Sequence, residues 1–213
     1  MRKINKGIDI ARESLYNQEM SRKALALKWS KKDGLAAFQK HWSEAKHYVD
    51  IVIFDLTPNA AEAWDDVVGL CELVLIVDDT DPESHFARDE VIQMCKKQKK
   101  EYRVVCTKGN TYPTALKIPN IQSHSYDGAL AKADVVGAFN YSTWYPNWKE
   151  ELKGVKMVAI GNQKGGVGKT TVALSIARKF KDAGDTVIFC EVDKQAGAFL
   201  VARKIEDYKE LFA

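Results

Sequence analysis

The segment that most limits how this chain can fold is 157–172, Met-Val-Ala-Ile-Gly-Asn-Gln-Lys-Gly-Gly-Val-Gly-Lys-Thr-Thr-Val. It places an apolar strand, a glycine-rich turn and the start of a helix in direct succession. A short apolar run without polar alternation is typical of a strand that helices cover on both faces of a parallel sheet. The segment therefore predicts an α/β fold with this strand in its interior.

The rest of the chain repeats the alternation of strand and helix. Branched apolar runs predict strands at 48–54, 73–77, 102–106, 157–160 and 186–190, and amphipathic stretches predict helices at 8–27, 34–47, 84–98, 170–182 and 198–212. This order predicts a doubly wound, mostly parallel sheet with helices on both faces. The segment 136–154 is expected to form a surface turn and a short helix that lead to a junction near Gly154.

The composition is typical of a soluble globular protein, with a single domain expected over residues 1–213. Of its 213 residues, 46% are hydrophobic, which suffices for a core without a disulfide or metal staple. No run approaches the roughly 20 apolar residues of a membrane span, so a cytoplasmic location is expected. The four cysteines form no paired motif and are expected to be free, mostly buried thiols. The 32 basic and 29 acidic residues nearly balance, so charge alone does not require a nucleic acid partner.

The glycine-rich turn has the residue types that bind phosphate. The backbone N–H groups of Gly165, Gly166, Val167 and Gly168 can turn inward, and the following helix adds the positive end of its dipole. Lys169 is expected to reach the β- and γ-phosphates, Thr170 to ligate Mg²⁺, and Thr171 to hydrogen-bond near the α-phosphate. The alternative is a glycine-rich turn without function.

The string from Lys164 to Thr171 resembles the deviant Walker A motif of the ParA/MinD superfamily, the ATPases of DNA partition and cell-division positioning. Gln163 stands where the general phosphate-loop formula has its first glycine, and Lys164 follows as an extra lysine. The resemblance implies a P-loop NTPase fold, ATP and Mg²⁺ as ligands, and a Lys164 that crosses a dimer interface to the partner's ATP. A Rossmann fingerprint is excluded because position 171 is not glycine.

Two acidic strand ends match further family elements. The end of the strand near 190 resembles the family's switch I, which implies that Asp193 orients the attacking water and that Glu191 supports the Mg²⁺. Glu191 replaces the usual aspartate there, and Lys194 replaces a proline. Asp55, at the end of another apolar strand, is the Walker B candidate that holds a water on the Mg²⁺; Thr57 and Pro58 would begin a γ-phosphate-sensing loop. The alternative for each carboxylate is a structural role at a strand end.

The order of these motifs departs from the family. There the phosphate loop precedes switch I and Walker B, whereas here Asp55 precedes the loop by more than a hundred residues. The simplest account is a circular permutation, in which 157–213 corresponds to the family's N-terminal part and 1–154 to its C-terminal part. An exchange of halves between two chains is the alternative. Thr107 and Lys108 stand where the family often has an adenine-reading asparagine, so ATP is expected from the resemblance alone.

The resemblance implies a homodimer with ATP sandwiched at its interface, a cargo adaptor of ParB type and non-specific DNA. The alternatives are a MinD-like or conjugation-accessory positioning ATPase and a small-molecule P-loop ligase or kinase. No amphipathic membrane anchor is evident near 146–154. A basic cluster at 96–103 is either a DNA-contacting patch or a solvated helix end. The aromatic residues between 139 and 148 either dock a partner or pack against the sheet.

Overall fold

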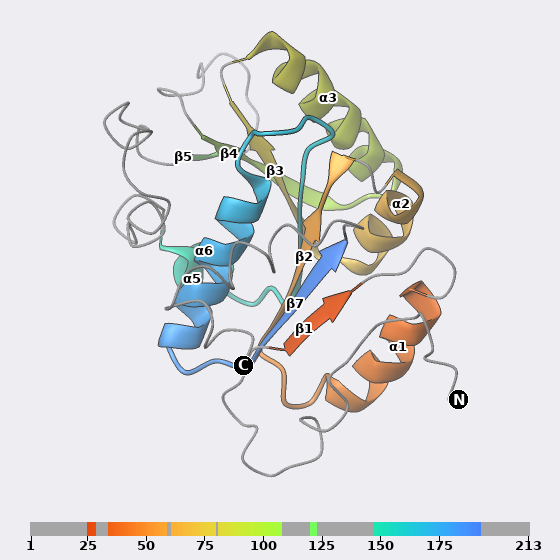
Figure 1. Cartoon of the computed structure of the whole chain (residues 1–213), viewed down its shortest axis with the longest axis vertical. Helices are drawn as coiled ribbons and strands as arrows, with labels where there is room; N and C mark the ends of the chain where they lie inside the picture. The colour runs from red at the N-terminus through yellow and green to blue at the C-terminus, as the bar shows by residue number, and fades with distance from the viewer. Residues whose placement is uncertain are drawn as a thin grey trace, which may run out of the picture.

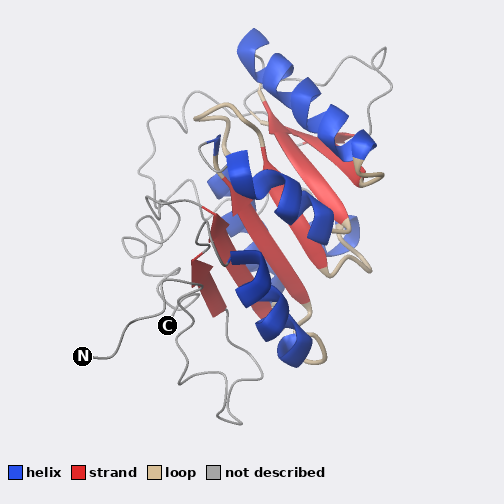
Figure 2. Cartoon of the chain, turned by 90° about the vertical axis from the view of Figure 1, so that its right-hand side faces the viewer, coloured by secondary structure: helices blue, strands red, loops and turns tan. Residues whose placement is uncertain are grey.

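A parallel sheet between two layers of helices forms the centre of the molecule (Figures 1 and 2). The structure, a computed structural model, describes residues 25–28, 34–58, 61–79, 81–107, 120–122 and 147–192. The strands are β1 (Leu25–Lys28), β2 (Ile51–Leu56), β3 (Leu73–Asp78), β4 (Glu101–Cys106), β5 (Asn120–Gln122), β6 (Met157–Gly161) and β7 (Val187–Val192). The helices are α1 (Gly34–Ala45), α2 (Ala61–Leu70), α3 (Pro82–Lys97), α5 (Trp148–Glu151) and α6 (Lys169–Asp182).

The seven strands in the described part of the chain are all parallel and lie in the order β1-β7-β2-β6-β3-β4-β5. The expected doubly wound α/β fold is confirmed, and it is consistent with a P-loop NTPase. Both strands of the segment 157–192 lie inside the sheet, because β6 separates β2 from β3 and β7 separates β1 from β2. Strands from the segment 157–192 therefore lie between strands from the first part of the chain, residues 1–154 (Figure 1).

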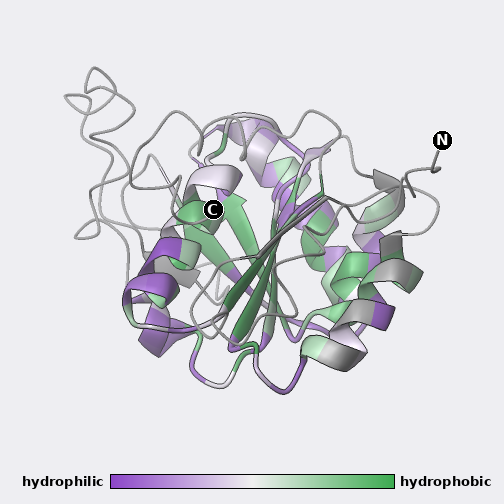
Figure 3. Cartoon of the chain, turned by 60° about the horizontal axis from the view of Figure 1, so that its bottom comes forward, coloured by the Kyte–Doolittle hydropathy of each residue, from purple (hydrophilic) through white to green (hydrophobic). Residues whose placement is uncertain are grey.

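The two faces of the sheet bury separate apolar cores. On one face, alternate residues such as Val52 and Phe54 pack against α1, α2 and α3. On the other face, Ile51 and Ile53 pack against α5 and α6. Every residue of β2, β3, β6 and β7 is buried, which explains why these strands show no polar alternation in the sequence. Figure 3 shows the strands as the hydrophobic centre and hydrophilic residues on the helices.

The sequence-predicted elements differ from the structure in three places. The predicted helix 8–27 is wrong at its end, because Leu25–Lys28 form β1, paired with β7; its residues 8–24 lie outside the described ranges. Ala, Leu and Lys favour helices as isolated residues, and strand pairing overrides that preference here. Helix α2 and strand β5 were not predicted, and the predicted helix 198–212 also lies outside the described residues.

Trp148 and the four cysteines are buried. Trp148 is 1% exposed and its Nε1 donates to Ser175 Oγ on α6 at 3.0 Å, so it packs inside the molecule. The other aromatic residues of that stretch, Phe139, Tyr141, Trp144 and Tyr145, lie outside the described residues. All four cysteines are free and buried, as predicted, and burial raises the pKa of Cys95 to about 11.

Gly161 ends β6 under the indole ring of Trp64 from α2. A Cβ at this position would lie 2.4 Å from the ring, far inside van der Waals contact. We expect Gly161→Ala to lower the free energy of unfolding by about 1–3 kcal/mol, the usual cost of overpacking a core. Urea denaturation would measure this loss. Gly165→Ala is the matched control, because a Cβ there meets nothing within 4 Å; equal losses in the two variants would contradict the steric explanation.

Candidate functional site

The phosphate-loop segment connects the carboxyl end of β6 to the amino end of α6. Gly166 and Gly168 have φ angles of 75° and 96°, in the left-handed region that glycine adopts most readily, and Gly168 is the N-cap of α6. Gly165 and Gly166 are exposed, and a Cβ on either would meet nothing within 4 Å. The turn is therefore open on its outer side, next to the amino end of a 14-residue helix.

Thr107, which follows β4, fastens the far side of this loop. Its Oγ1 donates a hydrogen bond to the carbonyl oxygen of Val167 at 2.7 Å. Its backbone N–H donates to the backbone carbonyl oxygen of Asp78, also at 2.7 Å. Val167 itself is fully buried. In the sequence, Thr107 occupies the position where the resembled family often has an asparagine that reads adenine. In this structure its hydroxyl contacts the phosphate loop.

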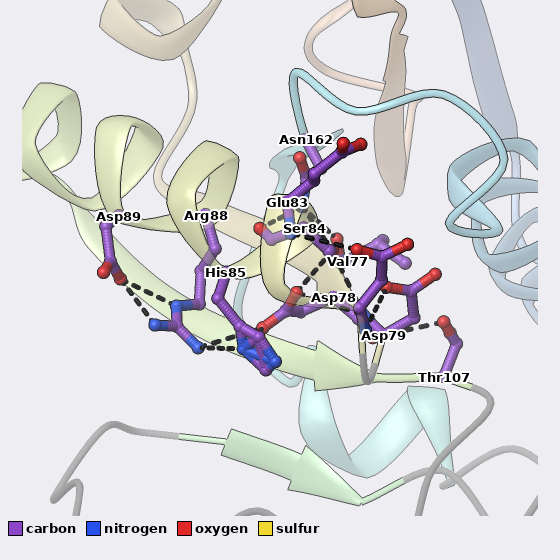
Figure 4. A network of polar contacts seen from close by, with 11 residues as sticks. Val77, Asp78, Asp79, Glu83, Ser84, His85, Arg88, Asp89, Thr107 and Asn162 are labelled. Atoms are coloured by element: carbon purple, nitrogen blue, oxygen red, sulfur yellow. Dashed lines mark hydrogen bonds and ion pairs between the residues drawn. The ribbon is translucent and has the colours of Figure 1, made fainter.

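Asn162 fastens the start of the loop to the neighbouring strand. Its buried side chain accepts a hydrogen bond from the backbone N–H of Lys164 at 2.8 Å through Oδ1. Its Nδ2 donates to the carbonyl oxygen of Val77, in β3, at 2.7 Å. One amide thus bridges the loop and β3, and Figure 4 shows Asn162 beside Val77 and Ser84.

A buried polar network continues from Asn162 into helix α3 (Figure 4). Ser84 Oγ donates to Asp78 Oδ1 at 2.5 Å, and the Arg88 guanidinium donates to Asp78 Oδ2 at 3.1 Å. Asp78 and Ser84 are fully buried and Arg88 is 6% exposed. Because a buried carboxylate needs hydrogen bonds and a compensating charge, this network holds the first turns of α3 against the end of β3.

Asp55 and Thr170 meet beside the loop although they are 115 positions apart in the sequence. Thr170 Oγ1 donates to Asp55 Oδ2 at 2.8 Å, and Asp55 is fully buried at the end of β2. Glu191 is the register partner of Asp55 on β7 and is 1% exposed. Paired residues of adjacent parallel strands point to the same face of a sheet, so both carboxylates lie on the α6 face. The structure thus brings the three predicted metal-site residues, Thr170, Asp55 and Glu191, to the edge of the sheet where its strands end.

The residues at this edge fit a magnesium ion by their donor chemistry. The Thr170 hydroxyl and the Asp55 and Glu191 carboxylates are oxygen donors, the type that Mg²⁺ prefers. Within the described ranges, no three His, Cys, Asp or Glu side chains gather closely enough to form a metal site by themselves. Mg²⁺ commonly retains several waters and takes further ligands from phosphate oxygens, so two carboxylates and a hydroxyl suffice for such a site.

Lys169, the first residue of α6, folds its side chain back onto the turn. It is 6% exposed, and its Nζ donates to the carbonyl oxygen of Lys164 at 2.5 Å. Burial lowers the pKa of Lys169 from its ordinary 10.5 to about 8, and the negative charge of Asp55 partly opposes this shift. Burial therefore affects the pKa of the Lys169 ammonium more than its anionic neighbour Asp55 does.

The remaining predicted site residues are placed as follows. Lys164 is partly buried on the loop, and its ammonium forms an ion pair with Asp81 at the start of α3. Thr171 is half-buried in the first turn of α6. Asp193 lies just beyond β7 and outside the described residues, so its predicted role stays a prediction.

Comparison with known proteins supports a P-loop ATPase. The model of a family described as an AAA domain matches residues 155–210, about a quarter of the chain, and this segment contains β6, the loop, α6 and β7. This family is of the ParA/MinD-like P-loop ATPase type. No curated protein and no solved structure matches the chain significantly. Among the described helices, none combines the length and the apolar character that crossing a membrane requires.

Sequence reasoning did not identify the residues that hold the loop in place. Asn162, Ser84, Arg88 and Asp81 were assigned no role, and Thr107 was considered only for base recognition. One local signal was available, because Asp81-Pro82-Glu83 has the N-cap, proline and acidic residue of a helix start. That pattern predicts where α3 begins, but it does not show that α3 lies against the phosphate loop.

The lowered pKa of Lys169 predicts proton uptake when nucleotide binds. A nearby phosphate stabilises the charged form and raises this pKa, so affinity is greatest below pH 8 and falls above it, by up to about tenfold per pH unit. Titration calorimetry with Mg-ADP at pH 9, in buffers of different ionisation enthalpy, should show uptake of up to one proton. Lys169→Arg, which stays charged, should bind without this uptake. Unchanged uptake in that variant would assign the proton to another group.

Proposed function

We propose that this chain is an ATP-driven dimerisation switch of the ParA type, in which two protomers close around two Mg-ATP molecules and separate after hydrolysis. The observation that carries the proposal is the hydrogen bond from Thr170 to Asp55. It joins the first turn of the phosphate-loop helix to the carboxylate expected from the family's Walker B element. The extra lysine of the loop, Lys164, favours this type of P-loop ATPase over others.

Each site residue has a separate task in this proposal. The loop N–H groups and Lys169 bind the β- and γ-phosphates, and Lys169 neutralises charge that develops on the transferred phosphoryl group. Thr170, Asp55 and Glu191 would hold a bound Mg²⁺ and its waters, and the ion would supply neutralisation of the phosphate charge. Asp193 orients the attacking water, and Lys164 reaches the partner's nucleotide.

The interleaved sheet supports a circular permutation within one domain. Strands β6 and β7, from the segment 157–213, each lie between strands from the segment 1–154. Neither segment could form this sheet without the other. Without the segment 157–213, β2 would lose both of its hydrogen-bonded neighbours, and without the segment 1–154, β6 and β7 would have no strand between them. The proposal is therefore that one chain supplies the whole nucleotide-binding unit in reordered form.

The proposed partners are a second copy of the chain, a cargo adaptor of ParB type and non-specific DNA. For DNA, the support is the basic group Lys96, Lys97, Lys99, Lys100 and Arg103, at the end of α3 and the start of β4. Part of this group is engaged within the chain: Lys100 donates to the carbonyl oxygen of Gly69, and Arg103 contacts Glu151 and Glu101. Lys96 and Lys97 complement the dipole in the last turn of α3.

Lys164→Ala tests the dimerisation switch. We expect this variant to bind nucleotide with an affinity close to that of the parent protein, because the loop N–H groups and Lys169 remain. It should fail to form dimers with ATPγS, because the partner's nucleotide loses its second lysine. Sedimentation velocity measures the dimers, and a fluorescent nucleotide measures binding. Lys153→Ala, at an exposed lysine after α5, is the control; dimers that persist in Lys164→Ala would refute the trans role.

The nucleotide-free mass tests the permutation against an exchange of halves. A permuted chain completes its own sheet and should be a monomer of 23.9 kDa without nucleotide. Exchanged halves would make the protein an obligate dimer, because each sheet would need strands from two chains. Light scattering after chromatography, with nucleotide removed and at decreasing protein concentration, gives this mass. A dimer that survives dilution would favour the exchange.

A further inference from the structure

The loop lysine that is proposed to act on a partner is held within its own chain. The Lys164 ammonium forms an ion pair with Asp81 Oδ2 and lies 3.9 Å from Glu83 Oε2. The Lys164 side chain is 19% exposed, whereas that of Asp81 is 49% exposed. The hydrogen bond to Asp81 raises the pKa of Lys164, and the same bond lowers the pKa of Asp81. Both directions show that each group stabilises the charge of the other.

Asp81 is held in position by the start of helix α3. It is the N-cap of α3, and its Oδ1 accepts a hydrogen bond from the backbone N–H of Glu83 at 3.0 Å. Its own N–H donates to Asp79 Oδ1 at 3.1 Å. The buried Asp78–Ser84–Arg88 network holds the same turn of the helix against β3. The carboxylate that receives Lys164 is therefore a fixed feature of the fold.

Two hydrogen bonds hold the Lys164 backbone, and its side chain extends from the loop to Asp81. Its N–H donates to Asn162, and its carbonyl oxygen accepts the hydrogen bond from Lys169 Nζ. A phosphate bound in the loop would compete with that carbonyl for the Lys169 ammonium. Arrival of nucleotide would therefore change the contacts of the Lys164 carbonyl oxygen.

We propose that Asp81 is a positioning residue that retains the Lys164 ammonium within its own chain in the monomer, so that dimer closure requires this ion pair to break. This inference rests on the proposed function, because it assumes that Lys164 serves the partner's nucleotide. Asp81 is fixed at the start of α3 in its own chain, so a Lys164 side chain that extends to a phosphate of another protomer has to leave it. A symmetric dimer breaks two such pairs, one in each protomer.

The expected size of the effect follows from the exposure of the pair. Ion pairs of this partly exposed kind change an equilibrium by about two- to fivefold each. Because two pairs break for each dimer, loss of the pair should strengthen nucleotide-dependent dimerisation by about four- to 25-fold. The direction of the change is informative, because a variant that merely damaged the fold would weaken dimerisation.

Asp81→Asn tests this inference, because asparagine keeps the N-cap hydrogen bond and removes the charge. Sedimentation velocity with saturating ATPγS would give the dimer dissociation constant, which should fall by the factor above, with unchanged thermal unfolding. Asp81→Ser, which also caps helices well, provides a second variant should Asp81→Asn fold poorly. Glu83→Gln is the control: its carboxylate lies farther from Lys164 and its side chain is 84% exposed, so its dimer constant should change less than twofold.

Two results would overturn the inference, and they are distinguishable. If both Asp81 variants dimerise like the parent protein while Lys164→Ala forms no dimers, the Asp81 contact does not restrain Lys164, and the proposed switch still stands. If Lys164→Ala dimerises normally, the trans role of Lys164 fails, and this inference fails with it.

Discussion

The arrangement of the site depends on the parallel sheet, and above all on the position of β6 between β2 and β3. Because all seven strands run in the same direction, their carboxyl ends lie along one edge. Asp55, Glu191 and the phosphate loop each follow or end one of these strands, so pairing alone brings them together. The hydrogen bond from Thr170 to Asp55 then joins α6 to β2 across the face of the sheet.

The phosphate loop is held on two sides by groups outside the recognised motif. Asn162 ties its start to β3, and Thr107 ties the carbonyl oxygen of Val167 to the end of β4. The exposed turn at Gly165 and Gly166 lies between these two fixed points. A loop fixed in this way loses less conformational freedom when it binds phosphate, which favours affinity. The unusual order of motifs in the chain does not disturb these contacts, because they depend on strand positions in the sheet.

Helix α3 connects the loop to the outer layer of the molecule. Its first turn contributes Ser84 and the N-cap Asp81, which contact Asp78 and Lys164 respectively. The helix is 16 residues long, and its basic last turn lies at its far end. A movement of the Lys164 side chain would therefore affect the start of α3 first, through its ion pair with Asp81.

The sequence by itself determined the fold class and the glycine turn, and it predicted which residues contact phosphate. These features are local: apolar runs specify buried strands, and the glycines specify a turn with positive φ angles at Gly166 and Gly168. The tertiary structure decided which distant residues meet, such as Asp55 with Thr170, and it turned Leu25–Lys28 into a strand against their helical preference. It also decided that Lys164 pairs with Asp81, a contact that depends on packing α3 beside the loop and has no signature in the spacing of either segment.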